Sequence, residues 1–222
     1  MGGTGAEGLG LARRWAHAGE DIVLGSRDPE RAQAVAQRLN DELRPQHAVS
    51  GADNAAAAGQ ADTVVLTVPF AAHAFLLKQV RRQLRPGTVL IDTAVPLATA
   101  VGDRANRMLG VWQGSAAEQA ADLVPEGVAV AAAFENISAG LLAGDERIDA
   151  DVIICTDSGE AYQEAARLAE AIPGVRALRG GGLENARLVE GLTALMVALN
   201  LAYHVHGAGL RITGLPAPVV PD

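Results

Sequence analysis

The stretch GGTGAEG, residues 2–8, decides the fold of this chain. Its glycines at positions 3, 5 and 8 have the G-x-G-x-x-G spacing, and a helical pattern over residues 9–18 follows directly. In a dinucleotide-binding turn, the first glycine makes the tight turn and the second lets a pyrophosphate approach the backbone. The third lets helix and strand pack closely, and the helix N-terminus faces the anion. Because glycine-rich turns are common, a plain turn is the alternative.

The second part of the pattern follows the apolar run DIVLG, which predicts a strand. Ser26 stands 18 residues beyond Gly8, where an NAD enzyme carries an acidic residue for the ribose 2′-hydroxyl, and the first carboxylate here is Asp28. A hydroxyl followed by Arg27, with Arg31 one helical turn later, is the donor set that a 2′-phosphate requires. The alternative is that both arginines are solvated surface charges. Together with the glycine turn, the pattern favours NADP(H) over NAD(H).

Short apolar runs alternate with helical patterns along most of the chain. The runs at 63–67, 88–92 and 151–155 are continuous rather than alternating, as in parallel strands covered on both faces. We therefore expect an α/β fold with a doubly wound parallel sheet. After the triple glycine at 180–182, a long apolar helix is predicted over about 183–206, and the tail 214–222 is predicted to be irregular. This divides the chain into a nucleotide-binding domain, 1–180, and a small C-terminal helical segment, 181–222.

The strand that normally feeds the glycine turn is missing from the pattern. Only Met1 and Gly2 precede Gly3, whereas such a turn follows a strand of five or six apolar residues in the middle of the sheet. Its loss would leave unpaired backbone groups on both neighbouring strands. We therefore expect an N-terminally truncated product or a mis-assigned start, with a short β-branched run encoded in frame upstream.

Composition excludes several classes of protein. Hydrophobic residues make up 49% of the chain, which excludes general disorder, and the net charge of −8 argues against nucleic-acid binding. A lone cysteine, Cys155, allows no intramolecular disulfide and is expected in the core. With neither a signal-peptide pattern nor 18 uninterrupted apolar residues, the sequence predicts a soluble cytoplasmic protein that binds no membrane.

Few titratable residues form a chemical pattern. His73, at a helix start, is expected to have a capping or surface role rather than to face a ligand. Glu184 and Glu190 flank Arg187 at three-residue spacings, typical of a surface salt-bridge face, and the default for Arg187 and Glu190 is a structural role in docking the helix. No metal site and no catalytic acid–base residue are predicted.

The whole pattern resembles the NADPH-dependent coenzyme F420 reductases, also called 8-hydroxy-5-deazaflavin:NADPH oxidoreductases. The likeness rests on the motifs GGTG (2–5), GLGLA (8–12), IVLGSR (22–27), VVLTVP (64–69), DTAVPL (92–97), AFENISAGL (133–141) and RLVEGLT (187–193). It implies a Rossmann-type domain with a small C-terminal helical part, hydride transfer between NADPH and the deazaflavin F420, and a homodimer.

The resemblance also implies roles for individual residues. Besides Gly3 and Gly8 of the turn, the pyrophosphate would be held by Thr4, Gly5, Ala6 and Glu7. The 2′-phosphate would be held by Ser26, Arg27 and Arg31. The path from adenine ribose to nicotinamide would be lined by Val68, Pro69, Ala94 and Val95. The segment 134–138, with Asn136 and Ser138, would lie near the nicotinamide and deazaflavin rings.

Direct hydride transfer requires the protein to set the distance between the rings and to exclude water. Small residues such as Ala132, Ala133 and Ser138 would suit close approach of the rings, although packing explains the alanines equally well. Two alternatives stay open. One is an NADP(H)-dependent reductase of a ferric, flavin, imine or ketone acceptor. The other is a non-catalytic NADP(H) sensor or an inactive truncated product.

Overall fold

The computed structural model describes residues 1–215 of the 222-residue chain, so the irregular tail predicted from 214 lies almost wholly outside the described residues. Helices and strands alternate as expected. The strands are β1 (Val23–Ser26), β2 (Ser50–Asp53), β3 (Thr63–Leu66), β4 (Val89–Asp92), β5 (Ala129–Ala132), β6 (Ala150–Cys155) and β7 (Val175–Gly181). The helices are α1 (Ala6–His17), α2 (Pro29–Leu43), α3 (Asn54–Gln60), α4 (Phe70–Val80), α5 (Ala116–Leu123), α6 (Ala139–Ala143), α7 (Gly159–Glu170) and α8 (Ala186–Tyr203), with 3₁₀ turns η1 (Ala98–Val101) and η2 (Leu183–Asn185).

Local sequence sets several helix starts. The Asp28 side chain accepts a hydrogen bond from the Arg31 amide and caps α2, with Pro29 at the first helical position. Ser115 and Ser158 cap α5 and α7 in the same way. Each cap satisfies one amide that would otherwise lack a partner at a helix N-terminus.

The strands form two separate sheets. Strands β1 and β2 pair in parallel as a two-stranded sheet, and the larger sheet has the order β3-β4-β5-β6-β7. All neighbours in the larger sheet are parallel except β5 and β6, which meet antiparallel through Ala132 and Cys155. The expected α/β fold with a predominantly parallel sheet is therefore confirmed, and the antiparallel pair is the one departure, where the chain reverses through α6 before entering β6.

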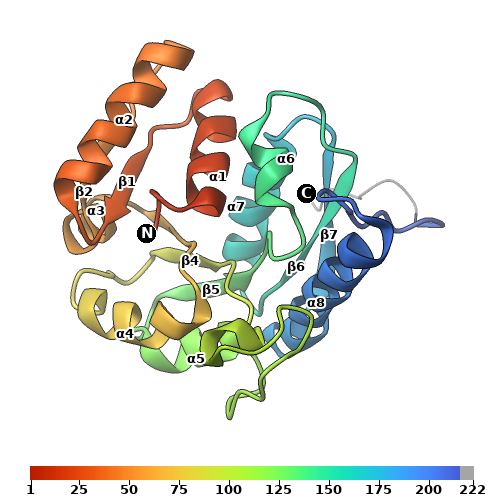
Figure 1. Ribbon diagram of the computed structural model, residues 1–222. Helices are drawn as coiled ribbons and strands as arrows, with labels where there is room; N and C mark the ends of the chain where they lie inside the picture. Colours follow the sequence, from red (N-terminus) through yellow and green to blue (C-terminus); the bar gives the residue numbers. More distant parts are fainter. Residues whose placement is uncertain (216–222) are drawn as a thin grey trace.

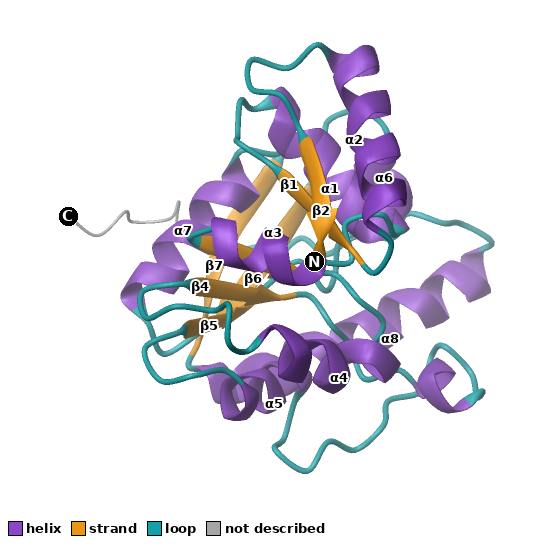
Figure 2. Cartoon of the chain, turned by 90° about the vertical axis from the view of Figure 1, so that its left-hand side faces the viewer, coloured by secondary structure: helices purple, strands orange, loops and turns teal. Residues whose placement is uncertain are grey.

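Helices cover both faces of the larger sheet, and each face has its own core. One core joins β4, β5 and β6 to α1, α6 and α7, with Trp15 packed edge-on against Phe134. The other joins the opposite face to α3, α4, α5 and the start of α8. A third, smaller core joins α1 and α2 to the β1–β2 sheet, which lies beside the larger sheet with the N-terminus between the two (Figures 1 and 2).

The register of the larger sheet brings three loops to one edge. Leu66 pairs with Asp92, and Asp92 pairs with Ala132, so β3, β4 and β5 end side by side. Parallel strands in doubly wound folds bind their ligands beyond these carboxyl ends. The loops that begin at 67, 93 and 133 therefore form the edge at which a ligand is expected.

Helix α8 is strongly apolar but only partly buried. Together with η2, the span Leu183–Tyr203 is long and apolar enough to cross a membrane by length and composition, and 28% of its most apolar window is buried. A helix that packs against a protein core or a second subunit passes the same test. Figure 1 shows α8 at the side of the molecule, next to β7.

Candidate functional site

The glycine turn lies where the two sheets meet. The Gly3 amide donates to Gly25 O in β1 at 3.0 Å, and the Gly5 amide donates to Gly2 O at 2.9 Å, which closes the turn. A Cβ at Gly8 would lie 2.8 Å from Gly3 Cα and 2.9 Å from Gly2 O, both backbone atoms that cannot move aside. Close packing therefore requires glycine at the third position of the motif, as the G-x-G-x-x-G pattern predicts.

The start of α1 is open to an anion. Gly5 is the N-cap and provides no side-chain hydrogen bond, so the first amides of the helix point outward without an intrahelical partner. Gly5 and Ala6 are exposed, and a Cβ at Gly5 would contact only Gly2 O, at 3.3 Å. Free amides and the positive end of the helix dipole make this turn suited to a pyrophosphate.

Glu7 does not oppose an anion there. Its Oε1 is buried without a hydrogen-bond partner, and burial raises the pKa of Glu7 to about 8. The side chain is therefore mostly neutral at pH 7, and the turn carries no full negative charge from this residue.

The second predicted anchor lies directly beside the turn. Thr4 Oγ1 and Ser26 Oγ are 3.5 Å apart, although the two residues are separated by 22 positions. Ser26 is buried at the end of β1, and its Oγ accepts the Asp28 amide at 3.2 Å. The structure thus brings the glycine turn and the serine together, as the sequence predicts.

Arg27 and Arg31 follow this serine on the outer surface. Both are exposed, and neither forms an ion pair with any residue of 1–215. Two guanidinium groups with no carboxylate partner in the described chain, next to a hydroxyl and a helix N-terminus, suit a 2′-phosphate.

The residues predicted to line the path to the nicotinamide lie after β3 and β4. Val68 is half-buried and lies against Gly2, where a Cβ would be 2.7 Å from Val68 Cγ1, and Pro69 is exposed at the start of α4. Ala94 is buried and its amide donates to Asp92 Oδ1 at 3.0 Å, whereas Val95 is half-buried. The four residues share one edge with the glycine turn.

The segment 134–138 follows β5 at the same edge. Phe134 is fully buried with a φ of 74°, a left-handed conformation that a non-glycine residue adopts only when its surroundings hold it there. The Asn136 side-chain amide donates to Asp151 O at 2.7 Å, and Ser138 Oγ donates to His206 O at 3.0 Å. The structure thus uses these two donors to brace the segment.

Sequence reasoning gave no role to Glu135, the most unusual residue of this segment. It is buried, both carboxyl oxygens lack a hydrogen-bond partner, and burial raises its pKa well above the usual range, with Glu190, Asp92 and Glu7 adding to the rise. Thr193 of α8 donates through Oγ1 to Glu135 O at 2.7 Å. A single acid inside the apolar run 128–137 was the signal that could have found it.

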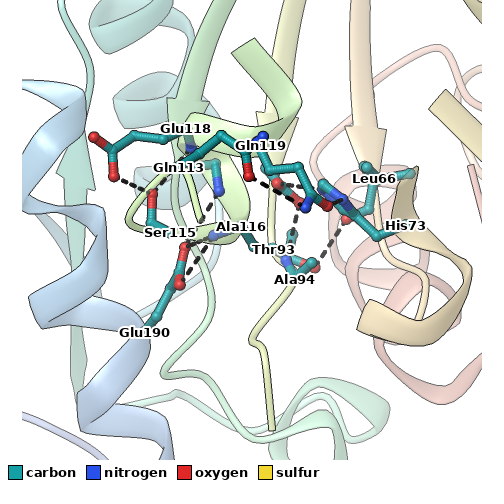
Figure 3. A network of polar contacts seen from close by, with 12 residues as sticks. Leu66, His73, Thr93, Ala94, Gln113, Ser115, Ala116, Glu118, Gln119 and Glu190 are labelled. Carbon is teal, nitrogen blue, oxygen red and sulfur yellow. Dashed lines mark hydrogen bonds and ion pairs between the residues drawn. The ribbon is translucent and has the colours of Figure 1, made fainter. Parts of the chain in front are cut away.

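The expectation of a capping or surface role for His73 is wrong. Its side chain is fully buried, with Nε2 2.7 Å from Asp92 Oδ2 and Nδ1 3.2 Å from Gln119 Oε1 (Figure 3). Burial lowers the pKa of His73, but the Asp92 carboxylate, with Gln119 and Glu190, more than offsets this and leaves the pKa raised. His73 is therefore part of a buried ion pair that ties α4 to the end of β4.

The surface salt bridge expected around Arg187 is also wrong for Glu190. Glu190 is 1% exposed, and its carboxylate accepts the amides of Ala116 (2.9 Å) and Ala117 (3.3 Å) at the start of α5 (Figure 3). Burial raises the pKa of Glu190 to about 7, and the two amide bonds moderate the rise. The residue anchors α8 to α5, which agrees with the expected docking role.

Cys155 lies in the core, as predicted.

A family model and curated relatives match this chain. The model described as "NADP oxidoreductase coenzyme F420-dependent" matches residues 1–96. The F420-dependent NADP reductase of Methanothermobacter thermautotrophicus is 48% identical over 97% of this chain and 94% of the relative. The protein of the same name from Methanocaldococcus jannaschii is 36% identical over 97% of each chain.

Solved structures share the fold. A crystal structure of an Arthrobacter protein described as an F420-dependent NADP-reductase superposes with a TM-score of 0.80 over 95% of this chain and 96% of that one, at 24% identity. A hypothetical protein from Sinorhizobium meliloti gives a TM-score of 0.66 over 82% of this chain and 83% of that one, also at 24% identity.

Proposed function

This chain belongs to the family of coenzyme F420-dependent NADP oxidoreductases, and we propose that the loops at the carboxyl ends of its strands divide the binding of the two cofactors between them. The protein is an oxidoreductase that transfers a hydride between NADPH and coenzyme F420. Either NADPH supplies the hydride and the oxidised deazaflavin accepts it, or the reduced deazaflavin supplies it and NADP⁺ accepts it. The residues of this chain therefore bind the two cofactors, orient their rings and exclude water.

The glycine turn holds the pyrophosphate. The open N-terminus of α1 presents the amides of residues 5–8, and Thr4 contributes its hydroxyl. Glu7 stays mostly neutral at this place because burial raises its pKa to about 8. A carboxylate in its ionised form would repel the diphosphate, so the burial of Glu7 favours binding.

Ser26, Arg27 and Arg31 hold the 2′-phosphate. The observation that carries this assignment is the 3.5 Å separation of Thr4 Oγ1 and Ser26 Oγ, because one nucleotide must reach both anchors. The exposed arginines flank the serine on the solvent side, where a phosphate can approach them.

The nicotinamide and deazaflavin rings meet beside the segment 134–138. Val68, Pro69, Ala94 and Val95 line the way to it, and Asn136 and Ser138 fix the segment through their bonds to backbone carbonyls. The neutral side chain of Glu135 keeps this place free of negative charge. Ala132 and Ala133 at the end of β5 are fully buried, so they pack the core behind this place and are not open to a ring.

Transfer of a hydride between two rings requires no acid–base residue of the kind that an alcohol dehydrogenase uses, and we assign none. A reductase of another acceptor and a non-catalytic NADP(H) sensor are not favoured, since relatives matched along almost the whole chain are named for the deazaflavin. The net charge of −8 does not favour a nucleic acid as a partner, and we expect a cytoplasmic enzyme.

The C-terminal segment from 181, so far as residues up to 215 describe it, joins two copies of the chain. Leu188 and Leu195 lie two turns apart on α8 and are 61% and 50% exposed. An apolar face of this kind is typical of an interface between subunits. The nucleotide-binding domain, 1–180, contributes the rest of the molecule.

The proposed dimer is tested by Leu195→Glu. The substitution places a charge in the apolar face and should convert a dimer into a monomer in sedimentation equilibrium, with little change in melting temperature because the side chain is half exposed in one subunit. Arg187→Glu, an exposed change on the same helix, is the control. A wild-type protein that is already monomeric, or that sediments with lipid vesicles, contradicts the dimer.

The proposed function is tested by mixing the protein with NADPH and oxidised F420. The absorption band of the oxidised deazaflavin should bleach, and NADH in place of NADPH should bleach it far more slowly. Tight NADPH binding without bleaching would favour the sensor. Bleaching by NADH and NADPH at equal rates would remove the 2′-phosphate assignment while leaving the reductase in place.

A further inference from the structure

The chain continues past α8 as residues 204–212, which we call the C-terminal strap. His204 ends the helix in a left-handed conformation, with a φ of 55°, and turns the chain back past α6 toward the start of β6 (Figure 1). There the Asp151 amide of β6 donates to Leu210 O at 2.7 Å. The C-terminal strap is therefore bonded to the backbone of the larger sheet.

The C-terminal strap braces the segment 134–138 at two points. Ser138 Oγ donates directly to His206 O at 3.0 Å. The Asn136 side-chain amide donates to Asp151 O at 2.7 Å, and Asp151 is the residue whose own amide bonds to the strap. A displacement of the strap would therefore disturb two of the bonds that hold this segment in place.

The carboxylate of Asp151 joins the strap to two strands. It is fully buried and accepts two hydrogen bonds from Arg176 of β7, at 2.8 and 2.9 Å, one from Arg211 at 2.9 Å and one from the Ile212 amide at 2.7 Å. Burial by itself raises the pKa of Asp151, but Arg176, the Ile212 amide and Arg211 together outweigh it and leave the pKa lowered. The carboxylate is therefore ionised at neutral pH and ties β6, β7 and the strap together.

Arg211 is the charged side chain by which the strap itself reaches this carboxylate. Its Nη1 donates to Asp151 Oδ1 and to Ala150 O, at 2.9 and 3.1 Å, and its Nη2 lies 2.9 Å from Asp149 Oδ1. The Arg211 side chain is 36% exposed, so replacing it removes no part of the core. Arg176 would still pair with Asp151 after such a change. Replacing Arg211 therefore loosens the strap without leaving a buried charge alone.

We propose that Arg211 is a positioning residue for the hydride transfer. Its ion pairs with Asp149 and Asp151 hold the C-terminal strap in place. The strap in turn holds Asn136 and Ser138 beside the two rings. This role rests on the proposed function, which places the meeting point of the rings at the segment 134–138.

The same contacts predict that the two cofactors depend on Arg211 unequally. The glycine turn and Ser26 lie at the start of α1 and the end of β1, and within residues 1–215 no hydrogen bond or ion pair joins them to the strap. Release of the strap should therefore leave the binding of the pyrophosphate and the 2′-phosphate unchanged. It should slow the transfer itself, because the rate depends on the alignment of the two reacting carbons.

The test compares Arg211→Met with Arg211→Lys in the full chain. Methionine keeps much of the apolar stem and loses the charge, whereas lysine keeps a charge within reach of Asp149 and Asp151. In Arg211→Met, the single-turnover rate of deazaflavin bleaching at saturating NADPH and deazaflavin should fall about 10-fold, while the NADPH affinity stays within about twofold of wild type. Arg211→Lys should recover most of the rate. Arg82→Met, which replaces an exposed arginine without an ion pair in residues 1–215, is the control and should change neither quantity.

Hydrogen exchange gives a second readout that needs no ligand. The Asp151 amide bonds to the strap, and the Ile137 amide bonds within the segment 134–138. Exchange at both amides should quicken by roughly 10-fold in Arg211→Met and stay near the wild-type rate in Arg211→Lys. Ser138→Ala removes the bond between the segment and the strap from the other side. It should also quicken exchange at Ile137 and lower the bleaching rate, with the NADPH affinity unchanged.

Two results would overturn the proposal. One is an equal fall of NADPH affinity and bleaching rate in Arg211→Met, which a general loss of structure produces. The other is faster exchange at Asp151 with the exchange at Ile137 and the bleaching rate unchanged, which would mean that the strap does not act on the segment. A wild-type protein that does not bleach the deazaflavin contradicts the proposed function, and exchange at Ile137 then decides by itself whether Arg211 positions the segment.

Discussion

The carboxyl edge of the strands carries two polar regions that differ in one respect. The nucleotide front, formed by Thr4, Ser26, Arg27 and Arg31, is partly open to solvent, and its two arginines have no carboxylate partner in the described chain. The buried network of His73, Asp92, Gln119 and Glu190 is closed, and its members bond to one another or to backbone amides (Figure 3). Groups that already bond inside the protein hold the fold, and groups left free can hold a ligand. Substitutions in the nucleotide front should therefore change the affinity for NADPH, and substitutions in the buried network should change the free energy of unfolding.

The largest effect is expected from Asp92→Ala in the buried network. It leaves the His73 imidazole buried without its carboxylate partner and the Ala94 amide without its acceptor, and breaking a buried pair costs about 3–5 kcal/mol. Urea unfolding measures the loss. Asp103→Ala removes an exposed carboxylate from a solvent-screened surface pair with Arg107 and should leave the free energy of unfolding nearly unchanged. Equal losses of unfolding free energy in Asp92→Ala and Asp103→Ala would contradict the assignment of a structural role to the buried network.

Glu190 gives the same region a pH dependence. Its folded pKa of about 7 is raised by burial above the ordinary 4.5, so the unfolded chain loses its proton first and the stability from this group falls as pH rises from about 4.5 to 7. Glu190→Gln should remove up to about 3 kcal/mol of the difference in unfolding free energy between pH 5 and pH 8. Glu7 and Glu135 act in the same direction and the Met1 amine in the opposite one, and all three remain in the variant. Glu184→Gln, which is exposed, is the control, and identical pH profiles for wild type and Glu190→Gln would contradict the assignment.

Substitutions of Gly8 and Gly5, two glycines of the same motif, should separate an effect on stability from an effect on NADPH binding. Gly8→Ala forces a methyl group against the backbone of Gly2 and Gly3 and should lower stability by about 2 kcal/mol. Gly5→Val places a Cβ that contacts only Gly2 O, at 3.3 Å, and should cost about 1 kcal/mol as a poorer N-cap, yet block the pyrophosphate and abolish NADPH binding. Melting temperature and NADPH fluorescence titration measure the pair. Normal NADPH affinity in folded Gly5→Val would contradict the placing of the diphosphate.

Local sequence was enough where one short segment decides the outcome. The Asp28–Pro29 pair alone marks the start of α2, because an N-cap aspartate followed by proline at the first helical position is a local signal. Local sequence did not predict features that depend on contacts between distant segments. The antiparallel meeting of Ala132 and Cys155 depends on how the chain reverses through α6, a five-residue helix with too few residues to show a period.

The two wrong expectations about side chains had a signal that was not used. His73 shares the spacing of Leu76, Leu77 and Val80, which form the buried face of α4, and this places its ring inside. Glu190 likewise falls next to Val189 on the buried face of α8. Helical periodicity therefore showed that these residues are buried, but the partners that make their burial tolerable come from α5 and β4. Only the folded chain identifies those partners.

The most direct test of the nucleotide front is the ratio of NADPH to NADH affinity in Arg27→Ala, measured by isothermal titration. Loss of charge-assisted bonds to the 2′-phosphate should weaken NADPH binding by about 10- to 100-fold and leave NADH binding and melting temperature unchanged. Arg38→Ala, an exposed arginine further along α2 with no ion pair in residues 1–215, should change neither affinity. Equal weakening of NADPH and NADH, or of Arg27→Ala and Arg38→Ala, would contradict the account.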